Sequence, residues 1–292
     1  MKSPPFEYAR AASVEEACEL LAQHGDEAKL IAGGQSLVPM MAFRLLRPAW
    51  LIDINEIASL NFIALETDAA RMGACTRQCD IQRDDKLAAS VPLLRQALAF
   101  VGHGQTRNRG TAGGSLAHAD PSAELPLVAQ ILEARLSARS KSGARTLSAV
   151  AFFEGAMTTA LHQEECLEEI QWPIWHERNT GSAFTEISRR HGDFAMVAAA
   201  AQVAVDGDGR CTRATFGVGG AAPTPVAFPA LARRLVGTKM DKATLRDVAQ
   251  EAAAALEPGS DTHASADYRR HLAGVLTTRV LQSAYDVARA AP

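Results

Sequence analysis

The sequence from Arg107 to Pro121 is RNRGTAGGSLAHADP, and it contains the glycine pair of Gly113-Gly114-Ser115. A second pair lies earlier in the chain, in Gly33-Gly34-Gln35-Ser36. Because glycine has no Cβ atom, such segments adopt unusual backbone angles and can bring consecutive N–H groups close to an anion. Ser36 and Ser115 add hydroxyl donors. Together the two segments indicate a diphosphate site that needs no basic side chain.

Neither segment matches the better known phosphate-binding motifs. No Lys-Ser or Lys-Thr follows the glycines, as a P-loop requires, and neither pair has the GxGxxG spacing of a dinucleotide-binding fold. Each pair taken alone also fits an ordinary tight turn. The sequence around the two pairs has to decide between these interpretations.

Length and composition indicate a folded protein of two domains. The chain has 292 residues, 47% apolar and 22% charged, and domains commonly contain about 100 to 200 residues. The net charge is −3 and the arginines are scattered, so nucleic acid is not an expected partner. No stretch approaches the roughly 20 apolar residues of a membrane span, and the N-terminus lacks a basic start and an apolar run. We expect a cytoplasmic protein.

The cysteines point to reduced thiols rather than to a metal site. They are Cys18, Cys75, Cys79, Cys166 and Cys211. Only two are near neighbours, at a spacing unlike zinc or iron–sulfur frameworks, and no two histidines have metal-ligand spacing. No metal ligands are expected in this chain.

Local patterns predict helices and strands along the first part of the chain. Ser13 and Glu16 have the spacing of a capping box, so a helix is expected until Gly25. A strand, a tight glycine turn and a returning strand are expected at 29–32, 33–36 and 50–54. Further predictions are a hairpin at 60–65 and 71–74, helices at 81–87 and 93–101, and strands at 133–140, 144–147 and 166–172. The stretch 105–126 is predicted to be a long functional loop.

The last part of the chain has a different character. The polar interval 176–181 fits a linker. Apolar runs at 196–205 and 211–218 flank Asp206-Gly207-Asp208-Gly209 and predict a long β-hairpin. Helices are expected at 230–236, 242–256 and 267–289.

The segments around the glycine pairs resemble the flavin-binding signatures of one family. Ile31–Pro39 and Arg107–Pro121 are similar, in order and separation, to those of the carbon monoxide dehydrogenase medium subunit and xanthine dehydrogenase FAD-subunit family of molybdenum hydroxylases. Phe184–Ala195 resembles the family's loop near the flavin ring, and Ala266–Ala273 resembles its terminal helix. The resemblance covers nearly the whole chain.

This resemblance implies an α+β fold of two domains. A PCMH-type FAD-binding domain of two α+β subdomains is expected at residues 1–176. A smaller C-terminal domain with a three-stranded sheet and a helical bundle is expected at residues 177–292. The local patterns agree with both.

The resemblance also implies where FAD binds. The first glycine segment would face the diphosphate, the second would complete the cradle, and Asp193 and Phe194 fall where the family approaches the isoalloxazine. Glu124 takes a position where relatives often carry Asp, which suggests a contact near the ribityl chain. The expected cofactor contacts are Ala32, Gly33, Gly34, Gln35, Ser36, Leu37, Gly73, Thr76, Thr111, Ala112, Gly113, Gly114, Ser115, Ala117, Asp120, Glu124, Asp193 and Phe194.

One candidate position has a second interpretation. Asp120 precedes a proline, and an Asp there commonly hydrogen-bonds its own loop. Thr185 and Glu186 stand where some relatives carry Lys beside the flavin, so this sequence gives no basis for a positive charge that tunes the ring. No catalytic side chain is expected, because the flavin itself would carry the redox chemistry.

As for function, the resemblance implies an electron-relay subunit. A large molybdopterin subunit would hydroxylate the substrate, a small subunit would carry two [2Fe–2S] clusters, and the FAD of this chain would deliver electrons to an external acceptor. Each cluster commonly takes four cysteine ligands, so five scattered cysteines cannot build the pair. A dimer of such heterotrimers is expected. The sequence names neither the substrate nor the acceptor.

Two other functions remain open. A self-sufficient FAD-dependent oxidase or dehydrogenase would need a base near the flavin and usually a longer cap domain, and neither is evident. A non-catalytic assembly protein that has lost FAD is disfavoured by the intact glycine segments.

Overall fold

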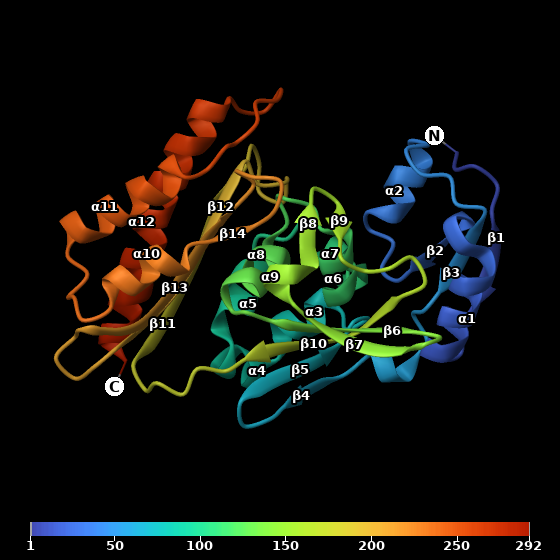
Figure 1. The fold of residues 1–292 in the computed structure, drawn as a ribbon, viewed down its shortest axis with the longest axis horizontal. Coiled ribbons are helices and arrows are strands. Elements are labelled where there is room, and N and C mark those ends of the chain that lie inside the picture. The colour runs from blue at the N-terminus through green and yellow to red at the C-terminus, as the bar shows by residue number, and fades with distance from the viewer. Residues whose placement is uncertain (1, 292) are drawn as a thin grey trace.

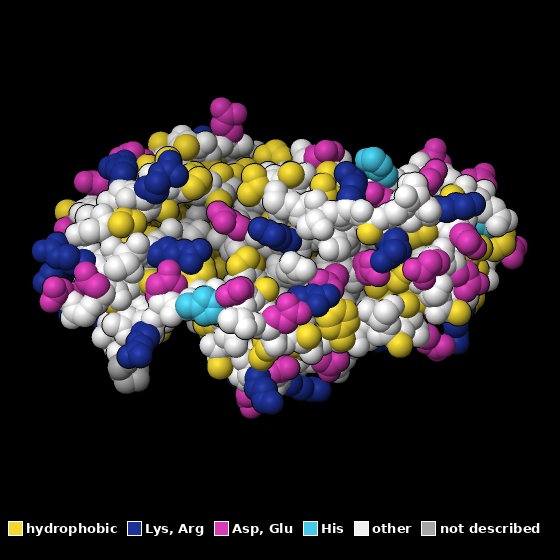
Figure 2. All heavy atoms as spheres, turned by 60° about the horizontal axis from the view of Figure 1, so that its bottom comes forward, with side chains coloured by type: hydrophobic (Ala, Val, Ile, Leu, Met, Phe, Trp, Pro, Cys, Tyr) yellow, Lys and Arg dark blue, Asp and Glu magenta, His cyan; other side chains and the backbone are white. Residues whose placement is uncertain are grey.

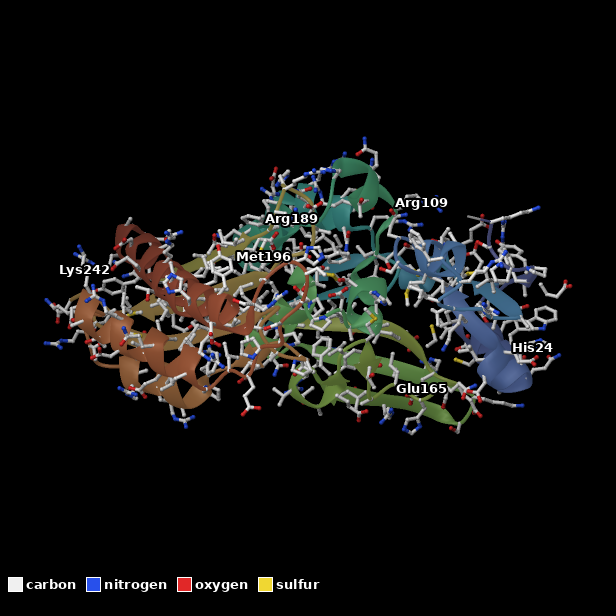
Figure 3. All side chains as sticks on the ribbon, turned by 90° about the horizontal axis from the view of Figure 1, so that it is seen from above. His24, Arg109, Glu165, Arg189, Met196 and Lys242 are labelled. Carbon is white, nitrogen blue, oxygen red and sulfur yellow. The ribbon has the colours of Figure 1, made fainter. Side chains whose placement is uncertain are left out.

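The computed structural model describes residues 2–291 and places three main sheets along an elongated molecule (Figure 1). The N-terminal sheet lies at one end, the largest sheet in the middle, and the C-terminal sheet with its helices at the other end. His24 and Lys242 mark the two ends in the view from above (Figure 3). This mixed helix and strand architecture confirms the predicted α+β fold class.

The N-terminal sheet is parallel and has the order β1-β3-β2. Its elements are β1 (Glu7–Arg10), α1 (Val14–His24), β2 (Ala28–Ile31), α2 (Leu37–Ala42) and β3 (Trp50–Asp53). The capping-box helix is confirmed, since the Glu16 N–H donates to Ser13 Oγ at 3.1 Å. The expected turn and return is wrong, because α2 follows the glycine segment and carries the chain back so that β2 and β3 run parallel.

The middle sheet is antiparallel and has the order β4-β5-β10-β6-β7. Its strands are β4 (Ile63–Leu65), β5 (Ala69–Gly73), β6 (Arg135–Ser140), β7 (Gly143–Ser148) and β10 (Cys166–Pro173). The elements between and beside them are α3 (Gln78–Arg83), α4 (Asp85–Ser90), α5 (Pro92–Leu98), α6 (Gly104–Arg109), α7 (Ala112–His118), α8 (Glu124–Ile131), α9 (Ala149–Phe152), β8 (Phe153–Gly155) and β9 (Thr158–Thr159). Trp172, Phe152 and Met72 are fully buried in the core between helices and sheet.

Two predictions in this region are wrong. The stretch 105–126 is not a long loop, because it forms α6, α7 and the start of α8. Its Gly, Ser and Asn residues are weak helix formers, so the pattern indicated a loop, and tertiary packing overrides that preference. The single helix expected at 81–87 is two helices, since Asp84 Oδ1 accepts from the Leu87 N–H at 2.9 Å and caps a new one.

The C-terminal sheet contains the predicted long hairpin. Its strands are β11 (Thr180–Ile187), β12 (Val197–Val205), β13 (Cys211–Gly219) and the two-residue β14 (Val226–Ala227), in that order. The three long strands match the expected sheet. The three predicted helices are α10 (Pro229–Leu235), α11 (Lys242–Ala254) and α12 (Ala266–Ala290).

Both faces of the C-terminal sheet are covered. Ala198 and Ala200 of β12 belong to the middle core, whereas Val197 and Ala199 pack with the C-terminal helices. A Cβ atom on Gly181 would lie 2.2 Å from the carbonyl oxygen of Ala284, so α12 approaches β11 closely only because this position is glycine. The sheet therefore joins the middle of the molecule to the helical end.

The surface carries charges of both signs. Lys and Arg side chains alternate with Asp and Glu over the face shown in Figure 2. Among residues 2–291, no helix combines the length and apolar character needed to cross a bilayer.

Candidate functional site

The first glycine segment connects the end of β2 to the start of α2. Gly34 has a φ of 71°, in the left-handed region that favours glycine. A Cβ atom on Gly33 would lie 2.2 Å from the carbonyl oxygen of Arg109, which belongs to the second glycine segment. The structure therefore brings the two predicted segments into direct backbone contact.

Five consecutive backbone N–H groups of the first segment are free. Within residues 2–291, no protein acceptor meets the N–H groups of Gly33, Gly34, Gln35, Ser36 and Leu37. The Ser36 side chain does not cap α2 either. Successive unpaired N–H groups around a left-handed glycine form a concave site for anions. This is the chemistry expected of a diphosphate site.

The second segment uses its backbone differently. The Ala112 and Gly113 N–H groups donate to the carbonyl oxygens of Thr76 and Ala74 at 3.0 and 2.8 Å. The Gly114 N–H donates to Thr111 Oγ1 at 3.0 Å, which caps α7. These three amides are thus engaged within the protein, which differs from the expectation that both glycine pairs present free N–H groups.

Packing explains why Gly113 is glycine. A Cβ atom there would lie 2.5 Å from the Cβ of Ala74, so α7 can lie against the chain that follows β5 only without a side chain at this position. Gly114 and Ala117 are exposed on the open face of α7, while Ser115 and His118 are half-buried beside them. α7 thus presents a face of small side chains against which a flat or extended ligand can lie.

A side-chain bridge joins the two segments, and sequence reasoning missed it. Arg77 donates from Nη1 to the carbonyl oxygen of Arg109 at 2.5 Å and from Nη2 to Asn55 Oδ1 at 2.7 Å. Asn55 Nδ2 in turn donates to the carbonyl oxygen of Ala32 at 2.8 Å. Neither residue lies in a recognisable motif, so no sequence signal indicated them.

Gly73 and Thr76 support the second segment from behind. A Cβ atom on Gly73 would lie 2.2 Å from the carbonyl oxygen of Leu60. Thr76 is buried and its Oγ1 donates to the carbonyl oxygen of Phe62 at 2.9 Å. Both residues hold the chain on which α7 rests, and protein atoms cover them.

The loop after α7 shows the loop-ordering role considered for Asp120. Ala119 has a φ of 51° and ends the helix, and Asp120 Oδ1 accepts from the Ser122 N–H at 2.8 Å. One carboxylate oxygen therefore orders its own loop. The side chain remains half-buried near the open face of α7.

Two carboxyl groups are buried where the middle core meets the C-terminal sheet. Glu124 at the start of α8 and Glu186 on β11 are each 8% exposed. Burial, followed by the negative charges of Glu186 and Asp120, raises the pKa of Glu124 to about 8. Burial raises the pKa of Glu186 to about 7. Within residues 2–291, Glu186 Oε2 has no hydrogen-bond partner.

The segment between β11 and β12 holds the remaining candidates. Asp193 and Phe194 are exposed, and Phe194 is 70% exposed. Gly192, with a φ of 87°, packs against His103, where a Cβ atom would lie 2.8 Å from the ring. Arg189 of this segment and Arg109 lie on the same side of the molecule in Figure 3. Thr185 lines a different cavity, together with residues of α11 and α12.

No metal site is added by the fold among residues 2–291, since no three His, Cys, Asp or Glu side chains gather in a suitable group. Four of the five thiols are buried. Burial raises the pKa of Cys75 to about 12 and that of Cys211 to about 11, which disfavours the thiolate that a metal needs.

Comparison with known proteins gives the same assignment along the whole chain. Residues 4–175 match the model of the FAD binding domain in molybdopterin dehydrogenase, and residues 182–284 match the CO dehydrogenase flavoprotein C-terminal domain. The chain is 38% identical to the 6-hydroxypseudooxynicotine dehydrogenase complex subunit alpha of Paenarthrobacter nicotinovorans, over 99% of this chain and 97% of that protein.

Two further relatives extend the comparison. The carbon monoxide dehydrogenase medium chain of Hydrogenophaga pseudoflava is 35% identical, over 98% of this chain and 99% of that one. The crystal structure of quinoline 2-oxidoreductase from Pseudomonas putida 86 superposes with a TM-score of 0.94 at 38% identity, covering 99% of this chain and 100% of that one.

Proposed function

Because the chain belongs to the family of FAD-binding medium subunits of molybdenum hydroxylases, we propose that it holds one FAD at its glycine segments and relays electrons from partner subunits to an external acceptor. The observation that carries this proposal is the row of free N–H groups from Gly33 to Leu37. The family model describes an FAD-binding domain over most of the chain, and this row is the matching chemistry in the structure.

The residues present fit the diphosphate of FAD. Five N–H groups offer donors without any positive side chain, and this row contains the left-handed Gly34, as anion-binding backbone concavities do. The Arg77–Asn55 bridge ties this row to Arg109 at the end of α6, so the donors are in place before the cofactor arrives. When bound, FAD accepts electrons and passes them on, and the protein contributes position and electrostatics.

The other expected contacts form part of the same proposal. Gly114, Ser115 and Ala117 would lie along the ribityl and ring portions, because these three small residues are exposed or half-exposed on α7. Asp120 and Glu124 would stand beside the ribityl chain, and Asp193 and Phe194 would cover the isoalloxazine from the β11–β12 segment. The proposed division is an FAD domain at residues 1–176 and a C-terminal domain at 177–292.

We further propose that molybdopterin and the two [2Fe–2S] clusters belong to a large and a small partner subunit in a dimer of heterotrimers. The relatives named above are a complex subunit and a medium chain. The buried thiols of this chain have raised pKa values, which disfavours the thiolate form that a cluster ligand needs. The substrate pocket would then lie in the large subunit. This chain would therefore not have to differ according to the substrate, although the named relatives have different substrates.

The test is a titration of the isolated apoprotein with FAD and with FMN, followed by flavin fluorescence. We expect FAD to bind more tightly than FMN, because FMN lacks the diphosphate and adenosine. Gly34→Val and Gly114→Val should weaken FAD binding, whereas Gly259→Val, where a Cβ atom meets open space, should leave it unchanged.

Partner subunits separate the proposal from its alternatives. Oxidation of small substrates only after the partners are added would support the electron relay. Oxidation by the isolated chain would indicate a self-sufficient oxidase, and a failure to bind FAD even with partners present would indicate an assembly protein.

A further inference from the structure

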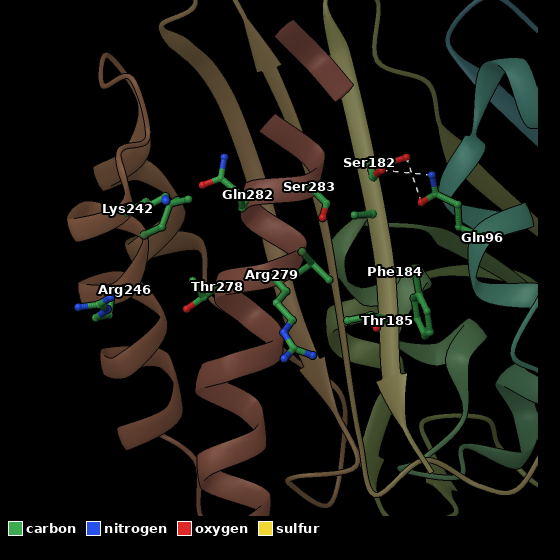
Figure 4. A pocket seen from close by; sticks show the side chains of 13 residues that line it. Gln96, Ser182, Phe184, Thr185, Lys242, Arg246, Thr278, Arg279, Gln282 and Ser283 are labelled. Atoms are coloured by element: carbon green, nitrogen blue, oxygen red, sulfur yellow. Dashed lines mark hydrogen bonds between the residues drawn. The ribbon is translucent and has the colours of Figure 1, made fainter. Parts of the chain in front are cut away.

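A groove on the C-terminal part of the molecule lies outside the flavin site. It encloses about 680 Å³ between α11, α12 and the free edge of β11, with Gln96 of α5 at its far side (Figure 4). In Figure 4, α12 lies between α11 and β11 and carries Thr278, Arg279, Gln282 and Ser283 on the side of the groove. None of the expected flavin contacts lines it.

The groove is positively charged. Lys242 and Arg246 extend from successive turns of α11, and Arg279 extends from α12. No Asp or Glu is among the lining residues, and within residues 2–291 none of the three cations has a carboxylate within ion-pair distance. Cations of one sign around one cavity repel each other unless an anion is bound.

The wall formed by β11 is a strand edge whose backbone is bonded to Gln96 at Ser182 and unpaired at Phe184. Ile187 faces β12, because its carbonyl oxygen accepts from the Met196 N–H at 2.8 Å. The backbone N–H and C=O groups of the residues that alternate with it therefore point away from β12. Ser182 is one of these residues, and its carbonyl oxygen accepts from the Gln96 side chain at 3.1 Å. The backbone N–H and C=O groups of Phe184 also point away from β12, and they have no partner in the part of the chain that the structure describes. Such an edge can pair with another strand.

We propose that this groove binds an extended, acidic segment of another protein chain, which adds as a strand to β11 and places its carboxylates near Lys242, Arg246 and Arg279. A preformed site for a small anion is a poorer match, since all three cations are exposed and held by no hydrogen bonds. The unpaired N–H and C=O groups of Phe184 point away from β12 together, which is the arrangement that pairing with an added strand uses.

This inference does not depend on FAD, so its test is separate from that of the flavin site. The full chain is mixed with a fluorescein-labelled peptide of nine alternating Glu and Val residues, and fluorescence anisotropy is followed at low and high NaCl. We expect salt-sensitive binding that falls at least about tenfold in the Arg246→Glu/Arg279→Glu double variant. The control variant Arg233→Glu/Arg270→Glu changes the same charge outside the groove and should bind the peptide normally.

Two comparison peptides test the mode of binding. A peptide of alternating Lys and Val should not bind. A peptide of the same Glu-Val sequence with every backbone nitrogen methylated keeps the charge but lacks the N–H groups needed to pair with β11, so it should bind about tenfold more weakly.

Four outcomes would overturn the proposal. Equal binding of the N-methylated peptide would show that charge alone is recognised, and displacement by millimolar inorganic phosphate would show a small-anion site. Unchanged binding by the double variant would place the contact elsewhere. Absence of peptide binding, with self-association of the double variant in ultracentrifugation, would show that the cations serve only to prevent the β11 edges of two copies from pairing. The thermal unfolding curve of each variant shows whether the protein is folded.

Discussion

The contact between Gly33 and Arg109 predicts that a single methyl group will separate the two glycine segments. In Gly33→Ala the new Cβ atom would lie 2.2 Å from the Arg109 carbonyl oxygen. Non-bonded heavy atoms approach to roughly 3.5 Å, so the segments must move apart by about 1 Å. Both groups in conflict are backbone, so no side chain can turn away. Overpacking of this kind costs about 1 to 3 kcal/mol, which corresponds to roughly 5- to 150-fold in FAD affinity if the cost falls on the bound state.

The assay is an FAD titration of the Gly33→Ala apoprotein by flavin fluorescence, with thermal unfolding measured in parallel. Gly104→Ala is the matched control, because a Cβ atom at Gly104 meets nothing within 4 Å. We expect the control to bind FAD as the parent does. Parent-like FAD affinity in Gly33→Ala would refute the reasoning that contact between the segments forms the site. If the melting temperature falls while FAD affinity stays unchanged, the contact stabilises the fold but does not contribute to FAD binding.

Three other perturbations test the same region. Gly34→Ala forces a side chain to φ 71°, which costs about 1 to 2 kcal/mol and should weaken FAD binding about tenfold, whereas Gly237→Ala at φ 82° should lower the melting temperature but not FAD affinity; equal affinities would contradict the site. Arg77→Lys loses the two-pronged bridge to Arg109 and Asn55 and should weaken FAD binding about three- to tenfold, and parent-like titration curves would argue against the bridge. The raised pKa of Glu124 stabilises the fold fully below its ordinary pKa of 4.5, and this stability is lost as pH rises through about 8. Glu124→Gln should therefore raise the melting temperature relative to the parent at pH 9 but hardly at pH 5, and a pH-independent difference would count against the buried carboxyl.

The sequence predicted elements wherever a local rule decides them. The capping box at Ser13 and the Asp-Gly turn before Cys211 each involve residues adjacent in the chain, so α1 and the β12–β13 hairpin were predicted correctly. The helices of 105–126 were missed because their stability comes from burial rather than from propensity. α8, for example, is almost entirely buried.

The site shows the same division between local and long-range information. The free N–H groups of the first glycine segment follow from local backbone conformation, and the glycine pair indicated them. Asn55 and Arg77 act across the fold, since each joins segments that are distant in sequence. No spacing rule relates such positions, and only the folded chain identifies them.

The two glycine pairs therefore have different physical roles despite their similar sequences. Gly34 is needed for a left-handed backbone that points N–H groups at a ligand, whereas Gly113 is needed because Ala74 leaves no room for a side chain. Gly33 links the two roles, since its missing Cβ lets the donor segment rest on Arg109. This close approach and the Arg77 bridge hold the donor segment against the second segment. Damage to the second segment should consequently weaken FAD binding by displacing donors that belong to the first.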